Sequence, residues 1–259
     1  MAVPAVGVGE HGRVPLPPST PGAAALVVAV DGPSGSGKST VSRAVATRLG
    51  LRYLDTGATY RAVTWLVLDR AVDPGDPAAT AALAEAADLQ VGTDPAAPWV
   101  RIDGHDVTEA VRGPEVTAAV SAVSASLGVR ARLVAFQREV VGEGGIVVEG
   151  RDIGSVVLPE ASVKVFLTAS DEARAERRAA ESAPAKAGAD HVAETRADLA
   201  RRDRLDSTRA TSPLVQADGS VALDSTNLGI DEVTQHVLAL CSDVLGADAL
   251  SEKQLEGER

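Results

Sequence analysis

The sequence predicts a three-layer α/β fold in which a central parallel sheet lies between helices. Short apolar segments typical of buried strands recur at residues 26–30, 146–149 and 163–167, and segments with helical periodicity separate them. Parallel strands need such crossover connections, so the alternation favours a parallel sheet. A glycine-rich turn directly follows the first apolar segment. At 259 residues, the chain is long enough for one such domain with insertions.

The glycine-rich turn at residues 32–40, GPSGSGKST, has the G-x-x-x-x-G-K-[ST] spacing of a phosphate loop, or P-loop. Glycines let the backbone curl until its N–H groups point at an anion, and the following helix adds the positive end of its dipole. We expect a nucleoside triphosphate here, with Lys38 along the outer phosphates and the Ser39 hydroxyl as a ligand of Mg²⁺. A chance glycine-rich turn is the alternative, which the strand before it and the helix after it disfavour.

The charge distribution favours a small anionic ligand over a nucleic acid. The net charge is −11, and the cationic side chains comprise 21 arginines and 4 lysines. The planar guanidinium of arginine suits phosphates, whereas an acidic surface does not suit a nucleic-acid backbone. Many of the arginines cluster between residues 174 and 209. We therefore expect no nucleic-acid partner.

The single cysteine, Cys241, excludes an internal disulfide framework and favours a reducing, cytoplasmic setting. It lies on a predicted helix face, where we expect a buried and inert thiol. No run of the chain approaches the ~18 apolar residues of a membrane span, so we expect no membrane partner.

We expect the chain to divide into three segments. Residues 1–24 are rich in proline, glycine and alanine and have no apolar period, which predicts a disordered N-terminal extension. Residues 25–245 form the folded domain, and the polar residues 246–259 form a flexible C-terminal tail.

The elements predicted directly after the phosphate loop are a helix, a strand and a second helix, at residues 39–49, 51–54 and 56–70. Gly50 ends the first helix, and Thr56 is the expected N-cap of the second. Trp65 lies on the apolar face of that second helix, so we expect it in the core. Arg61, one turn inside the helix, is either a site residue or a solvated surface charge.

Residues 76–126 interrupt the simple alternation of strands and helices, which indicates an inserted subdomain. The predicted elements are a helix, two short strands and a second helix, at residues 77–87, 89–91, 99–103 and 114–126. His105 has no second histidine or cysteine nearby to share a metal, so we interpret it as a surface residue.

The main fold resumes with a helix over residues 129–141 and the strand over 146–149, which ends in GRDIG at residues 150–154. Ligands of parallel sheets gather at the carboxyl ends of the strands. The polar residues predicted at these ends are Asp31, Asp55, Arg151, Asp152 and Thr168. Arg151 and Asp152 could form a structural ion pair, but the flanking glycines allow close backbone approach and favour a site.

Residues 171–206 are helical in pattern and rich in arginine, with a turn of small residues at 182–188. Such a helical hairpin is a candidate lid, at about residues 172–200, that would carry arginines over the phosphates and exclude water. Pairing with glutamates on the helix faces explains some of these arginines instead. A strand over residues 221–224 and a helix over 230–245 complete the domain.

Several motifs, in this order and spacing, resemble those of the bacterial cytidylate kinases, a family of P-loop nucleoside monophosphate kinases. They are VDGPSGSGKST, YLDTGATYR, VVEGRDIGSVV, VKVFLTAS, RRDRLDSTRATSPL and VALDSTNL, and they span nearly all of residues 26–245. The phosphate loop alone occurs in many families, whereas LDTGATYR, EGRDIG and the R-x-x-x-D-x-x-R pattern are far more specific. The inserted block resembles the nucleotide-binding insertion of that family.

The resemblance implies transfer of the γ-phosphoryl group of ATP to CMP or dCMP, with Mg²⁺. ATP would be bound by Gly32, Pro33, Ser34, Gly35, Ser36, Gly37, Lys38, Ser39 and Thr40, with Ser39 on the metal. The acceptor would be bound by Thr56, Tyr60, Arg61, Ser121, Arg130, Arg151, Asp152, Arg202, Asp206 and Arg209. The residues acting in the transfer would be Lys38, Arg61, Arg151, Arg177, Arg178 and Arg209.

Within the acceptor set, the resemblance assigns Arg61, Arg151 and Arg209 to the phosphate. It assigns Arg202 and Asp206 to the ribose, and Ser121, Arg130 and Asp152 to the base. The base readers make chemical sense, because cytosine presents an amino donor beside two acceptors. Uracil reverses the first two groups, so we expect a preference for CMP over UMP.

Three other functions are weighed against this one. A kinase for another nucleoside monophosphate or for shikimate shares the loop and lid but needs neither the insertion nor Asp206. A GTPase switch should carry an N-K-x-D motif and a transporter ATPase an LSGGQ-like signature, and the sequence has neither. We expect a monomer that acts on ATP and CMP or dCMP.

Overall fold

The computed structural model describes residues 23–182, 189–209 and 212–246. Nearly all of the predicted N-terminal extension (residues 1–22), the small-residue tip of the helical hairpin (183–188) and most of the C-terminal tail (247–259) lie outside the described residues. These expectations stay predictions.

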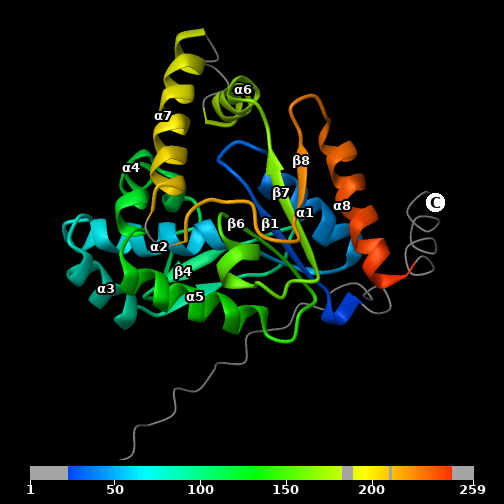
Figure 1. The fold of residues 1–259 in the computed structure, drawn as a ribbon. Helices are drawn as coiled ribbons and strands as arrows, with labels where there is room; N and C mark the ends of the chain where they lie inside the picture. The colour runs from blue at the N-terminus through cyan, green and yellow to red at the C-terminus, as the bar shows by residue number, and fades with distance from the viewer. Residues whose placement is uncertain (1–22, 183–188, 210–211, 247–259) are drawn as a thin grey trace, which may run out of the picture.

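The described residues form a five-stranded parallel sheet, which confirms the predicted fold class. Its strands are β1 (Val27–Asp31), β2 (Arg52–Asp55), β6 (Ile146–Gly150), β7 (Val163–Thr168) and β8 (Val221–Asp224). The order across the sheet is β2-β6-β1-β7-β8, so the strand before the phosphate loop lies at the centre (Figure 1). All five strands point their carboxyl ends toward the same edge, where ligands of parallel sheets bind.

Helices cover both faces of this sheet because side chains alternate along each strand. On one face, Val28 and Val30 of β1 share an apolar core with α1 (Lys38–Leu49) and α8 (Ile230–Leu245). On the other, Ala29 of β1 and Val148 of β6 pack with the end of α5 (Leu127–Val141). Cys241 of α8 is fully buried in the first core, as predicted, and burial raises the pKa of its thiol to about 12.

A second apolar core lies in the block between β2 and β6. It contains residues from α2 (Thr56–Asp69), α3 (Pro77–Ala86), α4 (Pro114–Val123), α5 and the short 3₁₀ turn η2 (Ala110–Arg112). It also contains β3 (Leu89–Val91) and β4 (Val100–Ile102), which form an antiparallel sheet with β5 (His105–Asp106). The sequence did not predict β5, because a two-residue strand carries no periodicity.

Several local expectations need correction. The N-cap of α2 is Asp55, whose carboxylate accepts from Ala58 N–H at 3.1 Å, whereas Thr56 is the first helical residue. Trp65 packs against the core but is only partly buried, and its ring lies tilted by 46° to that of His105, with 5.8 Å between centroids. Helix α4 ends at Val123, three residues earlier than expected. Gly50 does end α1, in the left-handed conformation (φ 64°) that glycine tolerates.

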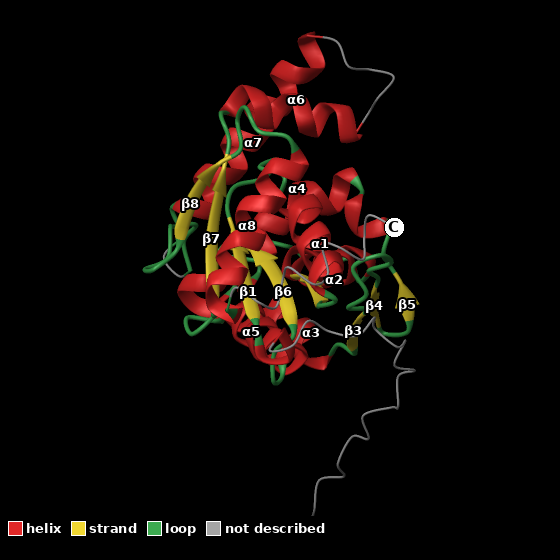
Figure 2. Cartoon of the chain, turned by 90° about the vertical axis from the view of Figure 1, so that its right-hand side faces the viewer, coloured by secondary structure: helices red, strands yellow, loops and turns green. Residues whose placement is uncertain are grey.

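Helices α6 (Asp171–Ser182) and α7 (Ala189–Ser207) pack against each other and stand beyond the carboxyl ends of β1 and β7 (Figures 1 and 2). Between β6 and β7, residues Ile153–Val157 form a π-helical turn, η3, which the sequence did not predict. A 3₁₀ turn, η1 (Ala23–Ala25), precedes β1.

Over the part of the chain that the structure describes, no single helix has both the length and the hydropathy needed to cross a membrane. Only α4 and α5 taken together reach those values, and they meet at a bend of 102°.

Candidate active site

A cavity of about 670 Å³ opens at the carboxyl edge of the sheet, between the phosphate loop, the inserted block and α7. Most of the residues that the sequence assigned to a site line it. They are Ser34, Gly35, Gly37, Lys38, Ser39, Thr40, Thr56, Tyr60, Arg61, Ser121, Arg130, Arg151, Asp152, Arg178, Arg202, Asp206 and Arg209. Gly32, Pro33, Ser36 and Arg177 do not line the cavity.

The phosphate loop has the backbone that its glycines predict. Gly37 caps α1 with a φ of 90°, and Gly35 has a φ of 78°. A Cβ at Gly35 would lie 2.8 Å from the carbonyl oxygen of Arg174. Any other residue at this position would therefore push the loop away from α6. Lys38 Nζ donates to Pro33 O at 2.7 Å, and burial together with nearby Arg151 lowers the pKa of Lys38 to about 7.

Gly32 lies against the backbone of β7 and does not line the cavity. A Cβ there would lie 2.0 Å from the carbonyl oxygen of Leu167 in β7. Ser36 is also turned inward, and its hydroxyl donates to Pro33 O at 3.1 Å. The loop residues that face the cavity therefore begin at Ser34.

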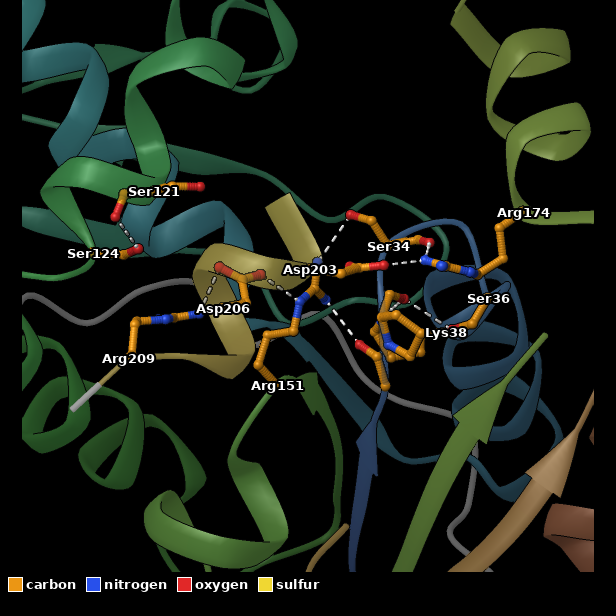
Figure 3. Close-up of polar contacts among 12 residues, drawn as sticks. Ser34, Ser36, Lys38, Ser121, Ser124, Arg151, Arg174, Asp203, Asp206 and Arg209 are labelled. Atoms are coloured by element: carbon orange, nitrogen blue, oxygen red, sulfur yellow. Dashed lines mark hydrogen bonds and ion pairs between the residues drawn. The ribbon is translucent and has the colours of Figure 1, made fainter. Parts of the chain in front are cut away.

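Arg151 joins the phosphate loop to α7 (Figure 3). Its guanidinium donates to Gly32 O at 3.1 Å and to the Ser34 hydroxyl at 2.9 Å. Its Nε donates to the Asp206 carboxylate at 3.1 Å. Asp206 also pairs with Arg209 at 2.7 Å. The Asp206 carboxylate, which the resemblance assigned to the ribose, is therefore occupied by the two arginines assigned to the acceptor phosphate.

The cavity holds a concentration of positive charge. Arg61 donates to Val111 O at 3.0 Å and to the Thr117 hydroxyl at 2.9 Å, so it is not a solvated surface charge. Burial and then the nearby Arg202 lower the pKa of Arg61 to about 9. Burial and then Arg151 lower the pKa of Arg202 to about 10. Cations held this close to one another would favour a multiply charged anion between them.

At the other end of the cavity, Arg130 and Asp152 form a buried ion pair. The Tyr60 ring lies under the guanidinium of Arg130, 5.4 Å from ring centroid to Cζ. Ser121 of α4 also lines the cavity, and its carbonyl oxygen accepts from the Ser124 hydroxyl at 3.2 Å (Figure 3). This end offers a carboxylate, a guanidinium and hydroxyls to a flat polar ligand.

The arginines of α6 separate into two kinds. Arg174 donates to Ser34 O at 3.0 Å and pairs with Asp171 and Asp203. Arg177 donates to the carbonyl oxygen of Ser225 at 2.6 Å and to its hydroxyl at 2.9 Å. Neither of the two lines the cavity, whereas Arg178 does.

Sequence reasoning missed Glu149, which lines the cavity beside the phosphate loop. Its carboxylate accepts from the Tyr53 hydroxyl, and it lies opposite Asp55 in the register of β6 and β2. Burial and then the Asp55 charge raise the pKa of Glu149 to about 7, against hydrogen bonds to Tyr53 and Ser39 that lower it. A carboxylate directly after the apolar run of residues 146–148 is the signal that could have found it. Oxygen donors from Ser39, Glu149 and Asp55 together fit Mg²⁺.

Sequence reasoning also missed Arg43, because no local sequence motif distinguishes it from a surface arginine. From α1 it donates to Pro95 O at 2.7 Å and to Ala96 O at 3.4 Å. This holds the β3–β4 loop, whose residues Ala96 to Trp99 line the cavity.

Comparison with known proteins places these motifs in a family. Residues 28–243 match the family described as cytidylate kinase. A cytidylate kinase of Rhodococcus jostii is 56% identical over 223 residues, which is 86% of this chain and 97% of the relative. One of Streptomyces coelicolor is 51% identical over 236 residues, 90% of this chain and 97% of the relative. Among solved structures, a shikimate kinase of Acinetobacter baumannii matches with 17% identity and a TM-score of 0.43, covering 86% and 97% of the two chains, which is too distant to bear on function.

Proposed function

The chain belongs to the cytidylate kinase family, and from this premise we propose that it transfers the γ-phosphoryl group of ATP to CMP or dCMP. The products are ADP and CDP or dCDP. One observation carries the proposal, namely that a phosphate loop and a cluster of buried and partly buried arginines line the same cavity. A chain with a net charge of −11 that gathers arginines there is built for two phosphorylated ligands.

On the donor side, the loop N–H groups and Lys38 bind the phosphates of ATP. Lys38 turns from its present acceptor, Pro33 O, toward the phosphates. Ser39, Glu149 and Asp55 supply the oxygen atoms near which Mg²⁺ would be held. When bound, the metal neutralises charge on the transferred phosphoryl group.

On the acceptor side, Arg61, Arg151 and Arg209 hold the phosphate of CMP, and Asp206 orients two of them. An acceptor phosphate is already an anionic nucleophile, so no strong general base is needed. The work of the protein is to align the two phosphates and to neutralise their charge.

Arg130 and Asp152, with Ser121, recognise the base. The carboxylate accepts from the amino group of cytosine, and the guanidinium donates to its acceptors. Uracil would set a carbonyl oxygen against the carboxylate, which leaves buried polar groups unpaired.

Arg178 is the arginine of α6 that we assign to the transferred phosphoryl group, because it lines the cavity. Closure of α6 and α7 over the site would exclude water that competes for the phosphoryl group. We propose that the enzyme acts in the cytoplasm, as its single cysteine suggests, and that it acts as a monomer.

A coupled assay of ADP release tests the function directly. CMP and dCMP should stimulate turnover of MgATP, with UMP weaker and AMP and shikimate inactive. Strong turnover of AMP or shikimate with none for either cytidine nucleotide would instead identify another small-molecule kinase and overturn the proposal.

A further inference from the structure

Asp31 is a buried carboxylate that the mechanism above does not use. It is the last residue of β1, directly before the phosphate loop, and its side chain is only 3% exposed. It does not line the cavity, so it does not touch a bound ligand there.

Both oxygens of Asp31 accept hydrogen bonds from one other loop. Oδ1 accepts from Ile153 N–H at 2.8 Å, and Oδ2 accepts from Gly154 N–H at 2.7 Å. These two N–H groups begin the π-helical turn η3, directly after Arg151 and Asp152. Across the same gap, Arg151 donates back to the Gly32 carbonyl oxygen at 3.1 Å. With the bond from Arg151 to the Ser34 hydroxyl at 2.9 Å, four hydrogen bonds join residues 31–34 to the acceptor-binding loop.

A charged carboxylate at this buried position carries a free-energy cost of desolvation. Burial raises the pKa of Asp31 to about 6, although the two backbone N–H groups and Lys38 lower it. The charged groups that act on it are Lys38 of α1 and Asp152 of the acceptor loop. A neutral side chain would avoid the burial penalty, but only a carboxylate presents two acceptor oxygens to two adjacent N–H groups.

We infer that Asp31 is the positioning residue of the acceptor site, whose carboxylate fixes the backbone of residues 153 and 154 so that Asp152 faces the base and Arg151 the phosphate. This inference rests on the proposed function, because it assigns Arg151 and Asp152 to the acceptor. It goes beyond that function by making acceptor affinity depend on a residue outside the cavity. Residues 153 and 154 do not line the cavity, so ATP affinity should depend on these two hydrogen bonds less than CMP affinity does.

The first test is Asp31→Asn in the full chain, with binding measured by calorimetry. An asparagine keeps one acceptor oxygen and turns its NH₂ group against the other N–H, so one backbone group loses its partner. Affinity for CMP should fall about ten- to a hundredfold, whereas affinity for a non-hydrolysable ATP analogue with Mg²⁺ should fall much less, because Asp31 acts on that site only through its charge near Lys38. Asp73→Asn is the matched control, since Asp73 also accepts from a backbone N–H, that of Gly75 at 2.9 Å, but lies outside the cavity. It should leave both affinities unchanged.

The second test is the pH dependence of cytidine binding to the unmodified protein. Cytidine has no phosphate that titrates near pH 6, so it reports the base site alone. Protonation of Asp31 removes one acceptor, and affinity for cytidine should therefore fall as the pH decreases from 7.5 to 5. In Asp31→Asn this dependence should be absent.

Equal loss of CMP and ATP affinity in Asp31→Asn, or no loss of either, would overturn the inference. If Asp31→Asn does not fold, the pH dependence of cytidine binding to the unmodified protein still tests the inference. An affinity for cytidine that does not change between pH 5 and 7.5 would also overturn the inference. Failure of the proposed function is distinguishable, since the unmodified protein would then neither bind cytidine nor release ADP with CMP.

Discussion

Arg130 and Asp152 pair with each other although 22 residues separate them and both side chains are almost fully buried, at 6% and 7% exposure. Arg130 comes from α5 and Asp152 from the loop after β6, so the helix before this strand and the loop after it each contribute one partner. Buried charges are tolerated when they are paired, and their fixed donor and acceptor pattern can discriminate between similar bases.

Asp152→Ala and Arg130→Ala should reduce the preference for CMP over UMP. Each mispaired polar group costs about 1–3 kcal/mol, so the ratio of kcat/KM for CMP and UMP should fall about ten- to a hundredfold. Asp231→Ala, which removes the exposed pair with Arg48 at 2.9 Å, is the control and should keep the ratio. Folded variants at Arg130 or Asp152 with unchanged selectivity would refute the assignment of the base site.

Asp206→Asn should weaken binding of phosphorylated acceptors more than binding of the nucleoside. Asp206 pairs with Arg151 and Arg209, so its loss releases the arginines proposed to hold the acceptor phosphate. We expect the Kd of CMP to rise about tenfold, with a much smaller change for cytidine, by calorimetry. Equal weakening of CMP and cytidine would favour the ribose role that the sequence suggested.

Arg178→Ala and Arg177→Ala should differ although the two residues are neighbours on α6. Arg178 lines the cavity, whereas Arg177 donates to Ser225 at 2.6 Å. Loss of an arginine that stabilises the transferred phosphoryl group should lower kcat at least about a hundredfold. Arg177→Ala should mainly lower Tm, by thermal unfolding, and keep kcat within about tenfold of the unmodified enzyme. A larger loss of kcat in Arg177→Ala would reverse the assignment.

Binding of ATP at pH 8 should take up close to one proton through Lys38. Burial lowers the pKa of Lys38 to about 7 in the ligand-free protein, so the amine is largely neutral at pH 8. Phosphates next to it favour the charged form and raise this pKa, so affinity should fall as the pH rises above 7. Calorimetry with a non-hydrolysable analogue in buffers of different ionisation enthalpy measures the proton number. Lys38→Met should show no uptake, and an equal number in both proteins would contradict the prediction.

The stability difference between the unmodified protein and Asp31→Asn should depend on pH. The pKa of Asp31 is raised from its ordinary value of 3.8 to about 6, so the folded state binds more protons than the unfolded state between these values. The free energy of unfolding of the unmodified protein should therefore increase relative to the variant as the pH falls. From pH 7.5 to 5 we expect a relative gain of about 1.4 kcal/mol in denaturant unfolding. A constant difference would show that Asp31 does not titrate in this range.

Most of the fold could be predicted because its signals are local. Apolar runs such as residues 146–148 predict buried strands, and the spacing of glycines around Lys38 predicts the loop. The N-cap of α2 was misplaced because Asp55 and Thr56 are adjacent and both are good caps, so only the backbone conformation decides between them.

The site was only partly predictable because several of its contacts join distant residues. Arg151 reaches Gly32 across 119 residues and Asp206 across 55, and no local pattern encodes either contact. That Arg178 lines the cavity and Arg177 does not is likewise set by contacts between distant parts of the chain. Consecutive residues on a helix point about 100° apart, and only the packing of α6 determines which of the two faces the cavity.

The continuity of the cavity has a consequence for inhibitor design. No wall of protein separates Lys38 from Asp152, since both line the same space of about 670 Å³. A bisubstrate compound, with adenosine and cytidine joined end to end through a chain of phosphates, could therefore occupy both halves at once. Joining the two converts the second binding event into an intramolecular one, so such a compound should bind far more tightly than either nucleotide alone.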